Sequence, residues 1–214
     1  MTQDSQDAIA DMAKNGRLEH IFSTPVFSVV LKDVDALNDA IRDLVLERER
    51  TTPSMEKSNQ GGWQSTPDFF DWGGSAVATL EQRLRSAVKI ATTRLLGAPI
   101  RIDCHVYGWA AVNRNGHYNT THVHPLATWS GVYYVDAGDE ALDTPGAALE
   151  FAHPIVASTM TFLPGALPSA RLVRPETGMI ILFPSYLQHG VRMYQGTRPR
   201  ISVPFNAHLR SVST

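Results

Sequence analysis

The sequence predicts a mainly β protein with flanking helices, and two observations carry this prediction. From residue 100 onward, short runs rich in β-branched and aromatic residues follow one another, separated by turn residues. Before residue 98, two segments instead have apolar residues at helical spacing. The chain has 214 residues, of which 43% are hydrophobic, so it can bury one good core. We therefore expect a single domain over residues 1–214, with N-terminal support over 1–98 and a β core over 99–210.

The support region begins with an expected strand and helix. Residues 21–31, IFSTPVFSVVL, are rich in β formers and are expected to form an edge strand, which would leave a site for pairing in a homodimer. Asp33 resembles the cap of a helix that runs to about Glu47. One face of this helix carries apolar residues, namely Val34, Leu37, Ile41 and Leu44.

A second, stronger helical pattern begins after Ser75 and ends before Gly97. Its apolar positions are spaced by three and four residues: Val77, Leu80, Leu84, Val88, Ala91 and Leu95. Between the two helices, residues 50–74 collect Pro, Gly, Ser and Asn, which is typical of a long loop. Because this loop also carries Trp63, Phe69, Phe70 and Trp72, we expect it to border a site as a wall or lid.

The β-rich region contains seven or eight expected strands: IDCHVYGWAAV, TWSGVYYV, AALEFA, TMTFL, RLV, GMIILF, HGVRMY and RISVPFN. So many strands with few helical gaps predict a sandwich or barrel. Antiparallel closure in a jelly-roll or cupin-like barrel, that is, a double-stranded β-helix, would limit exposed strand edges. The two helices would then pack on the outside, since the inner volume is needed for a site.

Composition excludes several classes of partner. The formal charge of −2 and the isoelectric point near 6.4 argue against nucleic acid and anionic membranes. The single cysteine, Cys104, rules out an intrachain disulfide and a cysteine-rich zinc site, which fits a reducing, cytoplasmic setting. Residues 1–18 lack the apolar centre of a signal peptide, and no long apolar run occurs, so we expect neither export by that route nor a membrane span.

Three of the eight histidines are placed as metal ligands would be. His122 and His124 are separated by one residue, so on a strand both side chains would leave the same face, with Val123 on the other. His189 follows an apolar strand that Pro184 is expected to end. Imidazole suits Fe, Zn, Cu and Ni, so three histidines define the metal only loosely. The other histidines have no comparable spacing, although His117 is close enough to His122 to line the mouth of the site.

Arg200 and Ser202 share one face of the last expected strand. An arginine directed into an apolar barrel would be a buried, uncompensated charge unless an anion meets it, and a dicarboxylate suits its planar fork. The alternative is that Arg200 pairs with an aspartate or glutamate at the surface.

These segments resemble the 2-oxoglutarate and Fe(II)-dependent oxygenases, particularly the branch related to prolyl hydroxylases. The resemblance covers most of the chain and rests on IFSTPVFSVVL, SNQGGWQS, NRNGHYNTTHVHPLATWSGVYYVDAG, PGAALEF, PETGMIILFPSYLQHGV and RPRISVPFN. It implies a double-stranded β-helix that uses Fe(II) as cofactor and 2-oxoglutarate as cosubstrate to hydroxylate a small molecule or a protein side chain.

The resemblance also implies roles for particular residues. His122 and His189 would be the first and distal metal ligands, and Arg200 would hold the distal carboxylate of 2-oxoglutarate with support from Ser202. Tyr134 falls where relatives place a tyrosine hydroxyl near the same carboxylate, although an ordinary core position would explain it equally well.

The sequence departs from the family pattern at the third ligand. Most relatives have a carboxylate two residues after the first histidine, whereas this chain has His124. A neutral imidazole there leaves the iron with more net positive charge, so the site would bind anions more tightly. Asp136 or Glu150 could supply the missing carboxylate from elsewhere, although neither has the expected spacing.

Two other functions remain open at this point. The first is a cupin-type enzyme with a three-histidine metal that does not use 2-oxoglutarate, because Gly116 followed by five residues and HVH matches the first half of the cupin motif. Its second half fails, since Thr128 and Trp129 stand where a glutamate is expected. The other is a non-catalytic, metal-binding jelly-roll module.

Overall fold

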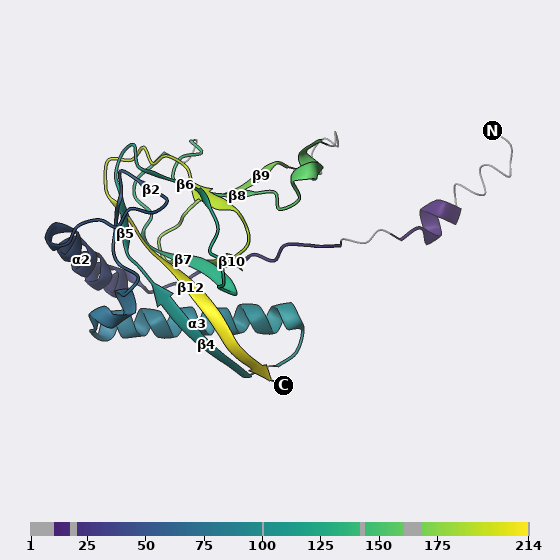
Figure 1. The fold of residues 1–214 in the computed structure, drawn as a ribbon, viewed down its shortest axis with the longest axis horizontal. Helices are drawn as coiled ribbons and strands as arrows, with labels where there is room; N and C mark the ends of the chain where they lie inside the picture. Colours follow the sequence, from purple (N-terminus) through teal and green to yellow (C-terminus); the bar gives the residue numbers. More distant parts are fainter. Residues whose placement is uncertain (1–10, 18–20, 100, 142–143, 161–167, 214) are drawn as a thin grey trace.

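Two antiparallel sheets face each other in the computed structural model, which describes residues 11–17, 21–99, 101–141, 144–160 and 168–213 (Figure 1). The larger sheet has the order β1 (Phe27–Val30), β10 (Met179–Pro184), β7 (Trp129–Asp136), β12 (Arg200–Ser213), β5 (Ala111–Asn113) and β3 (Trp63–Gln64), with β4 (Arg101–Gly108) also paired to β12. The smaller sheet has the order β2 (Asn59–Gln60), β6 (Tyr118–His122), β11 (His189–Val191), β8 (Leu149–Ala152) and β9 (Ala170–Val173). The predicted double-stranded β-helix is thereby confirmed.

The helices α2 (Asp35–Thr51) and α3 (Ser75–Leu96) pack on the outer face of the larger sheet, as predicted (Figure 1). Alternation along the strands explains why. In β7, Tyr133 and Val135 belong to the core against the helices, whereas Val132 and Tyr134 belong to the core between the sheets. The Tyr133 hydroxyl donates a 2.6 Å hydrogen bond to Oδ1 of the buried Asn38, which ties α2 to the sheet.

Several predicted boundaries are wrong at the N-terminus. Only Phe27–Val30 of the expected strand over residues 21–31 is a strand, because Pro25 has no N–H to donate to a ladder. As predicted, β1 is an edge strand. Helix α2 begins at Asp35 and ends at Thr51, with Val34 at the capping position. The predicted cap, Asp33, has a φ of 54° and forms part of the preceding turn instead.

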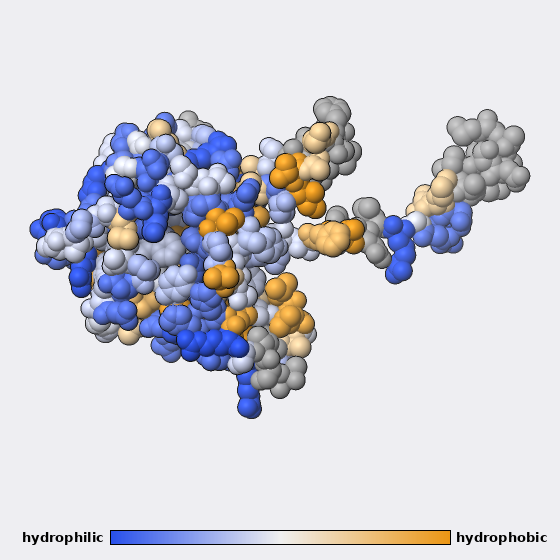
Figure 2. Space-filling model, in the orientation of Figure 1, coloured by the Kyte–Doolittle hydropathy of each residue, from blue (hydrophilic) through white to orange (hydrophobic). Residues whose placement is uncertain are grey.

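The second helix is close to the prediction. It spans Ser75–Leu96 and ends at Gly97, whose φ of 68° gives the left-handed conformation typical of glycine after a helix. None of the described helices is both long and apolar enough to cross a membrane. Exposed apolar side chains gather at the C-terminal end of α3, where Leu95 and Leu96 lie (Figure 2).

The long loop and the β region differ from prediction in detail. Residues 50–74 contain the two-residue strands β2 and β3 and a 3₁₀ helix, η1 (Phe69–Trp72), so β2 and β3 join sheets that were expected to begin at residue 99. The run IDCHVYGWAAV divides into β4 and β5. The expected strand TMTFL begins within a 3₁₀ helix, η2 (Val156–Met160), and its remainder, residues 161–163, lies outside the described residues.

Helix α3 gives a direct test of this packing, because it carries both buried and exposed leucines. Leu84 is fully buried against the sheet, whereas Leu95 is 53% exposed. We predict that Leu84→Ala lowers the free energy of unfolding by about 2–5 kcal/mol, since it removes apolar contacts and leaves a cavity. Leu95→Ala should change it by less than about 0.5 kcal/mol. Urea unfolding measures both, and equal losses would contradict the packing.

Candidate metal and anion site

Antiparallel pairing of β6 with β11 brings the three predicted histidines together. His122 is the last residue of β6 and lies opposite His189, the first residue of β11. His124 lies two residues beyond β6, where its backbone N–H donates to the Ser185 carbonyl at 3.1 Å. Candidate ligand nitrogens of the three rings all lie within 4.8 Å of one another, so the cluster could hold one metal ion.

The cluster forms differently from the predicted geometry. His122 and His124 were expected on one strand with Val123 facing away, but the strand ends at His122. Val123, 38% exposed, borders the same cavity as the histidines. The irregular backbone agrees with Pro125, which cannot donate to a ladder, and with Leu126, whose φ is 72°.

The histidine rings are neutral, and backbone carbonyls orient two of them. Nδ1–H of His122 donates to the Thr120 carbonyl at 2.7 Å, and Nδ1–H of His189 donates to the Leu187 carbonyl at 2.8 Å. In this tautomer Nε2 of each ring carries the free lone pair. Burial lowers the pKa of His189 to about 3 and the pKa of His124 to about 4, and His122 adds to both effects. Burial also lowers the pKa of His122.

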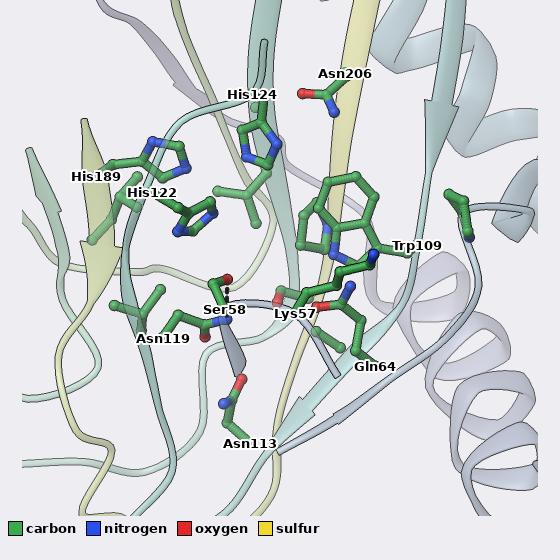
Figure 3. Close-up of a pocket in the computed structure, with 18 of the residues that line it drawn as sticks. Lys57, Ser58, Gln64, Trp109, Asn113, Asn119, His122, His124, His189 and Asn206 are labelled. Carbon is green, nitrogen blue, oxygen red and sulfur yellow. Dashed lines mark hydrogen bonds between the residues drawn. The ribbon is translucent and has the colours of Figure 1, made fainter. Parts of the chain in front are cut away.

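The histidines line a cavity of about 570 Å³ between the two sheets (Figure 3). This volume is within the range of pockets that hold small molecules. None of the residues that line it is Asp or Glu. Its ionisable walls are therefore the three histidines, two cations, Lys57 and Arg200, and the hydroxyls of Tyr107 and Tyr134.

Arg200, the first residue of β12, is only 2% exposed. Its Nη1 donates to Asn113 Oδ1 at 3.2 Å, and its guanidinium lies 5.1 Å from the centre of the Tyr134 ring. Among the described residues no carboxylate forms an ion pair with it, so the alternative of a surface ion pair is wrong. A buried cation without a counter-charge is unfavourable unless an anion binds there.

Two polar atoms at this site, one of them in the guanidinium itself, have no partner. Arg200 Nε and the Tyr134 hydroxyl are both buried without a hydrogen bond in the described structure. Burial raises the pKa of Tyr134, so the hydroxyl is a neutral donor. Ser202 is also buried and lines the same end of the cavity. Such unpaired donors around one cation fit an anion with several oxygen atoms.

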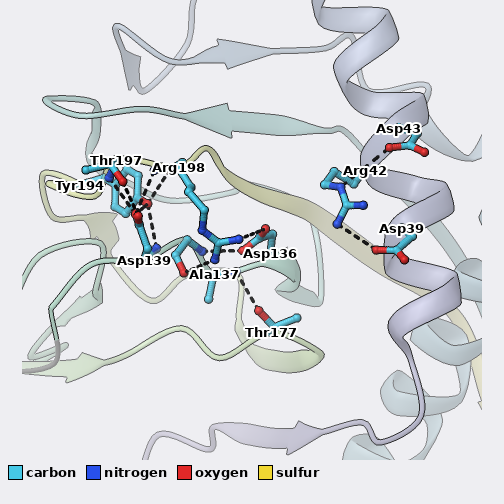
Figure 4. A network of polar contacts seen from close by, with 11 residues as sticks. Asp39, Arg42, Asp43, Asp136, Ala137, Asp139, Thr177, Tyr194, Thr197 and Arg198 are labelled. Carbon is cyan, nitrogen blue, oxygen red and sulfur yellow. Dashed lines mark hydrogen bonds and ion pairs between the residues drawn. The ribbon is translucent and has the colours of Figure 1, made fainter.

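The two carboxylates considered as extra ligands lie elsewhere, so that hypothesis is wrong. Oδ2 of Asp136 lies 3.6 Å from Nη1 of Arg198, and Oδ1 accepts a hydrogen bond from the backbone N–H of Gly138 (Figure 4). Glu150 pairs with Arg192, because its neighbours Leu149 and Phe151 occupy the inward positions of β8. Neither carboxylate lines the cavity.

A separate carboxylate fixes the loop that leads into β12. Asp139 accepts backbone hydrogen bonds from Thr197 at 2.8 Å and Arg198 at 3.0 Å, and a third from the Tyr194 hydroxyl at 2.9 Å (Figure 4). With the Thr197 hydroxyl, the strongest contributor, these bonds hold the pKa of Asp139 well below its usual range. This loop ends two residues before Arg200, so the contacts help to fix where β12 begins.

Other sequence predictions for the site hold only in part. His117 does not line the cavity, because its Nδ1 accepts the backbone N–H of Arg114 at 2.9 Å. The long loop does border the cavity, but through Lys57, Ser58 and Gln64. Its aromatic residues Trp63, Phe69, Phe70 and Trp72 pack into the helix-side core.

Further cavity residues were not predicted. Asn113 lies opposite Arg200 in the β5–β12 register, which no sequence pattern indicates. Asn206 could have been found, because the inward face of β12 that carries Arg200 and Ser202 continues along the strand to it. Trp109 and Gln64 lie in irregular or very short elements, so no period marks them.

Comparisons with known proteins support the resemblance stated above. Residues 107–206 match a family model described as "Putative 2OG-Fe(II) oxygenase". This confirms the predicted resemblance and its cofactor pair, Fe(II) and 2-oxoglutarate, at the level of the family description. No curated protein sequence matches the chain significantly.

Solved structures share the fold at low sequence identity. A prolyl-4-hydroxylase from Pseudomonas putida aligns with 96% of this chain and 99% of its own, with a TM-score of 0.60 and 16% identity. A Trichoplax adhaerens prolyl hydroxylase, solved with a hypoxia inducible factor peptide fragment, covers 97% and 94% with a TM-score of 0.60 and 11% identity. HygX from Streptomyces hygroscopicus, solved with nickel and 2-oxoglutarate, covers 97% and 87% with a TM-score of 0.58 and 12% identity.

The histidine cluster predicts the metal content of variants. His122→Ala, His124→Ala and His189→Ala should each weaken Fe(II) binding by more than about tenfold, because even residues that only orient a ligand have effects of that size. His105→Ala, at an exposed position outside the cavity, should bind metal normally. Anaerobic Fe(II) titration measures the affinities. Normal binding by His124→Ala alone would show that His124 is not a ligand.

Buried neutral histidines also predict a pH dependence of stability. Because the folded pKa values of His189 and His124 lie below the ordinary 6.5, the unfolded chain takes up protons first on acidification. The free energy of unfolding of the metal-free protein should therefore fall as the pH drops below about 6.5 towards 4. For the His189→Gln variant, this free energy should fall less steeply with decreasing pH. Urea unfolding at successive pH values measures both proteins. Equal slopes would contradict the assignment.

Proposed function

We propose that this chain is an Fe(II) and 2-oxoglutarate-dependent oxygenase that hydroxylates its substrate. The match of residues 107–206 and the shared fold support such an oxygenase in general terms. In the proposal, His122, His124 and His189 hold the metal, and Arg200 holds the distal carboxylate of 2-oxoglutarate with Ser202 and Tyr134. The observation that carries it is a buried, unpaired Arg200 in the same cavity as three neutral imidazoles.

The residues present fit both groups. Neutral imidazole is a suitable donor for Fe(II), and the three candidate nitrogens lie close enough for one ion. Arg200 Nε and the Tyr134 hydroxyl are the unpaired donors that a carboxylate would satisfy. With O₂ as the oxidant, bound Fe(II) and 2-oxoglutarate would supply an oxidative decarboxylation, to succinate and CO₂, that drives hydroxylation of a C–H bond.

The protein's own part is binding and orientation. The backbone carbonyls of Thr120 and Leu187 hold the His122 and His189 rings with Nε2 free. Asn113 holds Nη1 of Arg200, so the guanidinium is oriented before any ligand arrives. Tyr134 and Arg200 are both buried, and burial strengthens the attraction between Arg200 and a carboxylate.

His124 sets the charge of the site. With three neutral ligands, a divalent ion keeps its full charge of +2, which a dianionic 2-oxoglutarate would neutralise. A cupin-type enzyme that does not use 2-oxoglutarate also suits three histidines, but it gives no reason for the buried Arg200. A non-catalytic metal-binding module leaves the same cation unexplained.

The proposal also covers the cellular location, the class of substrate and the oligomeric state. The single cysteine suits a reducing, cytoplasmic location, and the near-neutral charge suits a small molecule or a protein side chain as substrate. The β1 edge offers a place for a homodimer to pair.

Arg200 gives the sharpest test of the proposal. Anaerobic addition of 2-oxoglutarate to the Fe(II)-loaded protein should produce a weak visible charge-transfer band. Arg200→Ala should weaken 2-oxoglutarate binding by roughly 10–100-fold, because it removes a charged hydrogen bond and a buried counter-charge. Arg198→Ala, an exposed arginine two residues away, serves as the control and should bind normally.

The outcomes separate the candidate functions. Unchanged affinity in Arg200→Ala would overturn the assignment of Arg200. Firm iron binding without any band in the wild type would favour the three-histidine cupin type, and absence of metal binding would exclude both enzymes.

A further inference from the structure

Part of the cavity remains for a substrate once 2-oxoglutarate is bound. Arg200 and Asn206 both line the cavity from β12, and they lie six steps apart along the strand, roughly 20 Å. The wall of the cavity across from the three histidines, called the distal lobe below, is lined by Lys57, Gln64, Trp109 and Asn206 (Figure 3). Figure 3 shows Gln64 and Trp109 across the cavity from the three histidines.

Gln64 places an unused amide in the distal lobe. It lies on β3, where its backbone pairs with Ala111, and its side chain is only 9% exposed. In the described structure the backbone of Gln64 is hydrogen-bonded, but its side-chain amide has no partner. Because Gln64 lines the cavity, this amide is accessible to a ligand that could both donate to it and accept from it.

Trp109 provides a flat apolar surface beside the metal site. Its backbone N–H donates to the Pro204 carbonyl at 3.0 Å, and its ring centre lies 5.7 Å from that of His124. Asn206 is already satisfied, because its Oδ1 accepts from the Ser130 hydroxyl at 2.7 Å and its Nδ2 donates to the Tyr107 hydroxyl at 3.0 Å. The lobe therefore combines a fixed polar wall, an apolar surface and one free amide.

Charge decides what this lobe accepts. Lys57 stands two residues after Met55, whose backbone N–H donates to the Gln64 carbonyl at 2.8 Å, so Lys57 and Gln64 belong to one loop that this bond closes (Figure 3). Lys57 has no ion-pair partner among the described residues. Since no lining residue is acidic, nothing in the cavity would neutralise an ammonium or guanidinium group of a substrate.

We propose that the distal lobe binds the substrate and that the substrate is a small organic acid without an ammonium group. Its carboxylate is bound by Lys57 and the Gln64 amide, and its hydrocarbon part lies on Trp109, facing the metal. This inference rests on the proposed function, because it assumes that 2-oxoglutarate occupies the Arg200 end.

Three matched probes test the charge preference: 3-phenylpropanoate, 3-phenylpropanamide and 3-phenylpropylammonium. Each is dialysed to equilibrium under anaerobic conditions against protein loaded with Fe(II) and saturating 2-oxoglutarate. We expect the carboxylate to bind most tightly and the ammonium compound least tightly. Equal or tighter binding of the ammonium compound, or no measurable binding of the carboxylate, would overturn the proposal.

Charge reversal at two lysines locates the effect. Lys57→Glu should weaken binding of the carboxylate by about fivefold or more, whereas Lys89→Glu, at an exposed position on α3, makes the same change of net charge and should leave it unaltered. Gln64→Leu should weaken binding of both the carboxylate and the amide. Wild-type affinity in Lys57→Glu would overturn the assignment.

The same dialysis keeps the two proposals apart, because retained 2-oxoglutarate is measured separately. Wild-type protein that fails to retain 2-oxoglutarate would overturn the proposed function and this inference with it. Retained 2-oxoglutarate with no preference for the carboxylate would overturn this inference alone.

Discussion

The strict alternation of side chains along β7, β10 and β12 is the constraint on which the rest of the structure depends. One set of alternate residues, including Tyr133, Leu182 and Phe205, belongs to the core against α2 and α3. The other set faces the smaller sheet and supplies Tyr134, Arg200 and Ser202 to the cavity. A shift of one residue in the pairing would bury the site residues under the helices and expose the core.

This constraint explains how apolar strands can carry polar chemistry. The helix-side core stabilises the larger sheet, so its inner face is free to hold a cation and hydroxyls that contribute little to packing. Asn113 and the hydrogen bonds of Asp139 hold the start of β12, and Arg200 is buried there despite its charge. Such a buried charge is unfavourable in isolation and becomes useful when an anion binds.

The alternation of side chains also explains which features of the fold and the site could be predicted from the sequence. The fold class, α3 and the face shared by Arg200 and Ser202 were predictable, because each depends on a local period of two or 3.6 residues. His189 was predictable because it follows an apolar strand that Pro184 ends. The meeting of His122 with His189 was predicted through resemblance, since pairing between distant strands leaves no local pattern. Gln64 and Trp109 could not be found, because β3 is two residues long and Trp109 lies in the break between β4 and β5. The aromatic loop was misassigned because bulky residues indicate burial without indicating which core they join.

The central claim is that three imidazoles share one metal whose remaining positions accept 2-oxoglutarate. X-ray absorption spectroscopy at the iron edge tests it most directly, with the Fe(II)-loaded protein measured before and after anaerobic addition of 2-oxoglutarate. The account predicts scattering from three imidazoles in both samples and a change in the oxygen ligands when 2-oxoglutarate is added. Fewer than three imidazoles, or identical spectra with and without 2-oxoglutarate, would contradict it.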